Sequence, residues 1–149
     1  MLRVLPALVL AVAACGGAAE AVDTGDVSGF PTSTVELDGE PLFVAIAANQ
    51  LDRSQGLRGV SDLGQLDGML FVFPGPTTTS FTMRDVPILL DVGFFDETGR
   101  LLEVRSMSPC EEDPCPSYPT GRPISAALER TRGGFEDVSP GAVLVFDLP

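Results

Sequence analysis

With 149 residues, 44% of them hydrophobic, the chain is long enough for one domain with one buried core. It contains no histidine, and all nine of its basic residues are arginine, which excludes Ser-His-Asp and Cys-His catalysis, histidine zinc sites, phosphate loops that need a lysine, and Schiff-base chemistry. The formal net charge of -12 argues against nucleic acid as a partner, because proteins bind its phosphates through lysine and arginine. We expect neither a cofactor nor a metal ion.

The first 14 residues are typical of an export signal. Arg3 precedes an apolar run at residues 4–14, which is shorter than the roughly 20 residues that a transmembrane helix needs. The sequence "VAAC", which ends at Cys15, resembles the lipobox of bacterial lipoproteins, where a signal peptidase cuts before a cysteine that becomes lipidated. We therefore predict a lipoprotein signal peptide at residues 1–14 and lipidation of Cys15. The alternative is an ordinary export signal, which would leave Cys15 as an odd thiol.

These features predict a protein held by its lipid on the extracytoplasmic side of the cell membrane, without crossing it. Residues 16–33 are rich in Gly, Ala, Asp and Ser and have almost no apolar periodicity, which is typical of a flexible linker. We predict a flexible tether at residues 15–33 and a single mainly β domain at residues 34–149.

In the first half of that domain, residues 34–47 contain two runs of strand-forming residues around Asp38-Gly39, a strong signal for a hairpin. Asn49 is placed to cap a short helix over residues 50–57. The continuously apolar residues 68–73 predict a buried strand, and the proline-containing residues 74–80 predict a loop.

In the second half, strands are predicted over four segments, and crossovers long enough for a parallel α/β sheet are not evident. The fold class is therefore mainly β: a small curved antiparallel sheet or open barrel with one or two short helices. The four predicted strands occupy residues 87–95, 100–107, 124–131 and 142–148.

Cys110 and Cys115 form an even pair in an acidic, proline-rich loop, which predicts a disulfide formed in an oxidising compartment. The competing interpretation is a metal site in which the two thiolates act with Glu111, Glu112 or Asp113. The missing histidine and the presence of only two thiolates favour the disulfide.

The order and spacing of several segments resemble the domain-of-unknown-function family 192, also described as an ancient conserved region of bacteria and archaea, over about residues 35–148. The matching segments are "VAIAANQLDRSQGLRGVSDL", "GMLFVF", "FTMRDVPILLDVGFFDETGRLLEV" and "ALERTRGGFEDVSPG". The resemblance implies a compact mainly β domain without an agreed activity. Thr82, Asp85 and Val86 depart from the family's Phe-Trp-Met-Lys-Asn-Thr pattern, which could alter what this chain binds.

The same motif supplies the candidate ligand-binding residues Met83, Arg84 and Asp85, with Asp91 and Glu129 in support. A carboxylate in an apolar run must be hydrogen-bonded or paired. We therefore expect Asp91 to be a structural residue bonded to Arg58, to Arg84 or to backbone N–H groups, the alternative being contact with a ligand. Glu129 is either a solvated strand residue or a ligand contact.

Two functions with a site remain open. The first is a lipid-anchored binding or accessory domain of the cell envelope, in which Arg84 and Asp85 contact a small molecule or an envelope protein. The second is an acid-base enzyme that acts on a saccharide or cell-wall fragment through Asp85 and Glu129. A third interpretation, a purely structural part of an envelope complex, needs no site.

Overall fold

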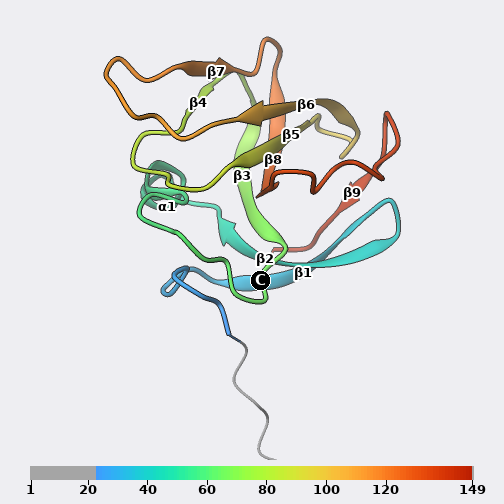
Figure 1. Ribbon diagram of the computed structural model, residues 1–149. Coiled ribbons are helices and arrows are strands. Elements are labelled where there is room, and N and C mark those ends of the chain that lie inside the picture. The colour runs from blue at the N-terminus through green and yellow to red at the C-terminus, as the bar shows by residue number, and fades with distance from the viewer. Residues whose placement is uncertain (1–22, 149) are drawn as a thin grey trace, which may run out of the picture.

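The structure, a computed structural model, describes residues 23–148; the predicted signal peptide and Cys15 lie outside the described residues. Within this part of the chain, a seven-stranded sheet has the strand order β6-β5-β8-β3-β2-β1-β9, and β4 and β7 form a separate two-stranded sheet (Figure 1). The strands are β1 (Thr32–Leu37), β2 (Glu40–Ala47), β3 (Gly68–Thr77), β4 (Ser80–Thr82), β5 (Leu90–Phe95), β6 (Leu101–Met107), β7 (Ser117–Pro119), β8 (Ile124–Thr131) and β9 (Leu144–Val145), and the helix is α1 (Gln50–Gln55).

The local signals at the start of the domain are confirmed. Asp38 and Gly39 have φ angles of 54° and 83° and join β1 to β2 in an antiparallel hairpin, as a two-residue turn requires. The side chain of Asn49 accepts a hydrogen bond from the Asp52 backbone N–H at the start of α1, and Gly56 follows the end of the helix. The hairpin and the start of the helix are therefore determined by residues close together in the sequence.

The sheet is mixed, because β2 and β3 are parallel while the other strand pairs are antiparallel. The predicted fold class, mainly β with a curved sheet and a short helix, is confirmed, and the parallel pairing of β2 with β3 is the exception to its antiparallel character. A parallel connection needs a dozen or more residues, and the segment 48–67 supplies them although α1 occupies only a small part of it. Because most of this segment lacks the periodicity of a helix, the sequence contained no sign of a crossover between parallel strands.

Three strand boundaries also differ from the prediction. β3 continues through Pro74 and Pro76. Both prolines lie between Val72 and Thr77, where the register with β8 shifts, so the sheet does not need an N–H donor from them. β5 begins at Leu90 because the preceding chain forms a turn and loop. The last strand is reduced to Leu144–Val145.

The sheet curls into a half-barrel. The backbone N–H of Leu101 donates to the carbonyl of Ala142, and that of Leu144 donates to the carbonyl of Gly99, so the start of β6 lies beside β9 although these strands are at opposite ends of the strand order. Alternate residues of β8 enter two hydrophobic clusters, with Leu128 in one and Ala127 in the other. The cluster containing Leu128 joins residues of both sheet edges and fills the curl.

The chain packs against the domain before Thr34, where the sequence predicted the domain to begin. Val27 is buried in the cluster that contains Ala127. The Asp26 carboxylate accepts hydrogen bonds from the hydroxyl and backbone N–H of Ser61 and from the N–H of Asp62, and these bonds hold its pKa below the ordinary value. These contacts place residues 23–33 in the folded part.

Candidate functional site

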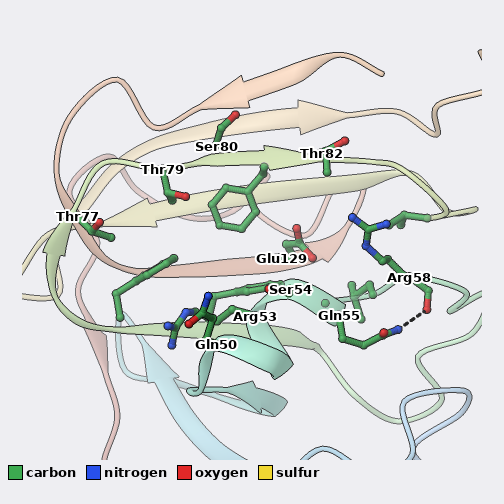
Figure 2. A pocket seen from close by; sticks show the side chains of 16 residues that line it. Gln50, Arg53, Ser54, Gln55, Arg58, Thr77, Thr79, Ser80, Thr82 and Glu129 are labelled. Atoms are coloured by element: carbon green, nitrogen blue, oxygen red, sulfur yellow. Dashed lines mark hydrogen bonds between the residues drawn. The ribbon is translucent and has the colours of Figure 1, made fainter. Parts of the chain in front are cut away.

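A pocket of about 520 Å³ lies between α1 with its following turn on one side and β4 on the other, over β3 and β8 (Figure 2). Its size is within the range of small-molecule sites. The lining residues are Gln50, Arg53, Ser54, Gln55, Gly56, Leu57, Arg58, Phe71, Phe73, Thr77, Thr79, Ser80, Phe81, Thr82, Val86 and Glu129.

Two local features of the chain form the two sides. At the end of α1, Gly56 lies against the ring of Phe71, where an added Cβ would be 3.4 Å from the ring. On the other side, β4 alternates so that Phe81 is buried while Ser80 and Thr82 are exposed. Figure 2 accordingly shows the hydroxyls of Ser80 and Thr82 directed away from the centre of the pocket.

Arg53 holds one side of the pocket in place. Its Nη1 donates to the carbonyl oxygens of Ala48 at 2.5 Å and Val72 at 3.0 Å, and its guanidinium lies 5.2 Å from the centre of the Phe73 ring. These contacts join α1 to β3 and to the residue that follows β2, and they use part of the donor capacity of Arg53.

Arg58, the second cation of the lining, is held by an exposed ion pair. Its Nη1 lies 3.3 Å from the Asp85 carboxylate, and the two side chains are 36% and 71% exposed. The backbone carbonyl of Arg58 accepts a hydrogen bond from Gln55 Nε2, which fixes the turn after α1 (Figure 2). An exposed ion pair of this kind is weak, so a ligand can compete for the guanidinium.

Glu129 is a buried carboxyl at the centre of the pocket (Figure 2). Its residue is 5% exposed, and its strand neighbours Met69 and Val92 are fully buried. Burial raises the pKa of Glu129 to about 8. At pH 7 the carboxyl is therefore mainly protonated.

The Glu129 carboxyl has no protein partner within residues 23–148. None of the four ion pairs found there includes Glu129, and no side-chain hydrogen bond reaches it. Because no fully enclosed side-chain oxygen in this part of the chain lacks a partner, both Glu129 oxygens must be reached from the pocket. The arrangement leaves a carboxylic acid available to a ligand.

The structure does not gather the predicted site residues in one place. Met83 is 1% exposed and belongs to the hydrophobic core. Arg84 forms two hydrogen bonds with the Asp113 carboxylate, at 2.5 and 3.4 Å, whereas Asp85 has a φ of 59° and pairs with Arg58. The turn thus sends two adjacent side chains to different partners, and only Asp85 approaches the pocket, through Arg58.

The Asp91 carboxylate is hydrogen-bonded and paired within the protein, as expected of a carboxylate in an apolar run. Its carboxylate accepts hydrogen bonds from Ser106 Oγ at 2.6 Å and the Gly133 N–H at 2.8 Å, and it lies 3.1 Å from Arg132 Nε. The cation that pairs with it is Arg132, not Arg58 or Arg84 as expected. Asp91 therefore joins β5, β6 and the end of β8 and does not support the pocket directly.

The Cys110–Cys115 disulfide is confirmed, since the two sulfurs are bonded to each other. The thiolate metal site is thereby excluded, and within residues 23–148 no group of three or more His, Cys, Asp or Glu side chains could hold a metal ion. In the same part of the chain, no helix has the length and apolar character needed to cross a membrane.

Most residues of the lining were not among the candidates that the sequence offered. Gln50, Ser54 and Arg58 follow one another at intervals of four, so a signal for one polar side of α1 and its turn was present. No sequence pattern indicated that Phe71, Phe73 and Thr79 line the same pocket. Their approach to α1 depends on the parallel crossover.

The protein is thus a small β domain in which a curled half-barrel sheet carries a partly polar pocket beside a short helix. The chain belongs to the family DUF192, described as an uncharacterized ACR, whose model matches residues 33–146. Among curated proteins, none matches this chain.

Two solved structures are similar to this chain at 25% sequence identity. One is a "putative transcription regulator" from Sinorhizobium meliloti 1021, with a TM-score of 0.70 over 77% of this chain and 93% of that chain. The other is a protein of unknown function from Novosphingobium aromaticivorans DSM 12444, with a TM-score of 0.72 over 86% of this chain and 94% of that chain. Both share the fold.

The contacts of Asp91 lead to a stability prediction. Asp91→Ala should lower the free energy of unfolding by about 2 kcal/mol, because it leaves the Gly133 N–H and Arg132 without their acceptor. Asp85→Asn is the matched control and should cost less than about 1 kcal/mol, because its ion pair is exposed and asparagine tolerates the left-handed φ at this position. Urea denaturation measures both, and equal losses would contradict the structural role of Asp91.

The burial of Glu129 leads to a pH prediction. The folded protein keeps a proton that the unfolded chain releases above its ordinary pKa of 4.5, so the stabilisation is complete below pH 4.5 and is lost as the pH rises to about 8. This contribution amounts to at most about 5 kcal/mol. Urea denaturation at several pH values should show a decline in the wild type that Glu129→Gln lacks; parallel pH curves would refute the raised pKa.

Proposed function

We propose that this DUF192 protein is a lipid-anchored binding domain of the cell envelope, and that its pocket binds a small polar molecule. The observation that carries the proposal is the unpartnered, buried carboxyl of Glu129 at the centre of the pocket. A carboxyl in apolar surroundings is normally paired or hydrogen-bonded within the protein, whereas both oxygens of Glu129 are open to the pocket. A ligand in the pocket can bond to them directly, which favours a binding domain over a purely structural one.

The lining indicates the kind of ligand. Amide and hydroxyl side chains of Gln50, Ser54 and Thr79 line the pocket together with the carboxyl, and Phe71 and Phe73 add apolar surface. Polar groups that fix orientation, combined with aromatic surface, suit a polyhydroxylated molecule with one apolar face, such as a saccharide fragment. Arg58 adds a cation that can bind an anionic substituent.

The enzyme alternative has less support. It requires Asp85 and Glu129 to act as a pair of carboxyls, but Asp85 is outside the lining and is paired with Arg58. Glu129 is the only carboxyl among the lining residues, so the pocket holds one half of an acid-base pair.

The predicted export signal supports an envelope location, and the Cys110–Cys115 disulfide is typical of oxidising compartments. The net charge of -12 disfavours nucleic acid, so the description of the Sinorhizobium meliloti relative as a transcription regulator is not carried over. An envelope protein remains the alternative partner to a small molecule.

Mass spectrometry of the protein purified from its native membrane tests the anchor. We expect the mature N-terminus to be an acylated Cys15, because the lipobox-like sequence ends at this residue. An unmodified N-terminus further along the chain would contradict lipid anchoring.

Ligand-observed NMR with neutral and acidic monosaccharides and disaccharides tests the pocket. Arg58→Ala should weaken binding of acidic sugars about tenfold, because it removes a charge-assisted hydrogen bond. Arg84→Ala is the matched control, since Arg84 pairs with Asp113 outside the lining. A larger loss in Arg84→Ala would return the site to the Met-Arg-Asp motif, and no binding of any sugar would overturn the proposal.

A further inference from the structure

Glu129 determines which chemical group the centre of the pocket can accept. Glu129 lies on β8 between β3 and β5, opposite the buried apolar residues Met69 and Val92, and no donor within residues 23–148 bonds to its carboxyl. A carboxylic acid in such surroundings presents one O–H donor and one carbonyl acceptor to the pocket.

The charged groups that face Glu129 come from one side only. Arg53 and Arg58 belong to α1 and its following turn, while the lining residues of β3 and β4 carry no charge. Arg53 is hydrogen-bonded to two backbone carbonyls, and Arg58 is held by the exposed Asp85. Neither arginine forms an ion pair with Glu129. Because Glu129, the one carboxyl of the lining, is mainly protonated at neutral pH, the lining itself carries a net positive charge.

We propose that Glu129 donates a hydrogen bond from its carboxyl to a carboxylate on the ligand while Arg58 binds the same anion, so that the pocket selects acidic sugars over neutral ones. This inference rests on the proposed saccharide site and names its specificity-determining residue. A hydrogen bond between a carboxylic acid and a carboxylate is charge-assisted and stronger than one between neutral groups. A neutral sugar would form only the weaker kind.

Proton linkage makes this recognition measurable. The ligand carboxylate accepts a bond only from the protonated form of Glu129, whose pKa is raised to about 8. Affinity should be constant well below pH 8 and fall about tenfold for each pH unit above it. Burial of the ligand's negative charge next to an ionised Glu129 would be unfavourable, which reinforces the fall.

The experiment is isothermal titration calorimetry of the purified mature protein with D-glucuronate and D-glucose between pH 6 and pH 10. The wild type should bind glucuronate at least tenfold more tightly than glucose at pH 7 and lose this preference above pH 8. Glu129→Gln keeps a neutral donor, so it should bind glucuronate within about threefold of the wild type at pH 7 without the decline. Glu97→Gln, at an exposed turn, is the matched control and should keep the wild-type pH profile.

Each outcome decides one of the two claims. Binding of glucose and glucuronate with equal affinity would overturn the selection of a carboxylate and leave the saccharide pocket standing. Absence of binding by either sugar and by all others tested would overturn both. If Glu129→Gln does not fold, Arg58→Ala provides the second test: it should weaken glucuronate binding but retain the decline above pH 8, and loss of that decline would exclude Glu129 as its source.

Discussion

Strand β3 is the constraint on which the arrangement of the domain depends, because it pairs in parallel with β2 on one edge and antiparallel with β8 on the other. The parallel pairing requires the long crossover that contains α1 and places the helix beside the sheet. The antiparallel pairing is regular from Met69 to Val72 and shifts before Thr77, after which the chain turns into β4. Both sides of the pocket therefore originate from the pairings of one strand.

The same pairings explain why Glu129 is an acid rather than an ion pair. Met69 and Val92 lie opposite it on the two adjacent strands, and the face it shares belongs to a hydrophobic cluster. Desolvation disfavours the charged form, and the two arginines of the lining have other partners. A protein that keeps such a group gives up stability at neutral pH, which is typical of residues retained for binding.

Structural features that depend on residues close together in the sequence could be predicted. Contacts between segments far apart in the sequence could not. The hairpin at Asp38-Gly39, the cap at Asn49 and the limits of β8 follow from local turn, capping and strand preferences. The separation of Arg84 from Asp85 required the left-handed φ of Asp85, which is unusual outside glycine. The pairing of Asp91 with Arg132 and the meeting of α1, β4 and Glu129 join segments far apart in the chain, for which periodicity carries no information.

The central claim is that the pocket contains a carboxylic acid at neutral pH. Carbon-13 NMR of side-chain carboxyls, recorded over a pH titration of the wild type and of Glu129→Gln, measures its ionisation directly. We expect one glutamate resonance to titrate near pH 8 and to be missing in Glu129→Gln. Titration of every glutamate and aspartate resonance below about pH 6 would contradict it.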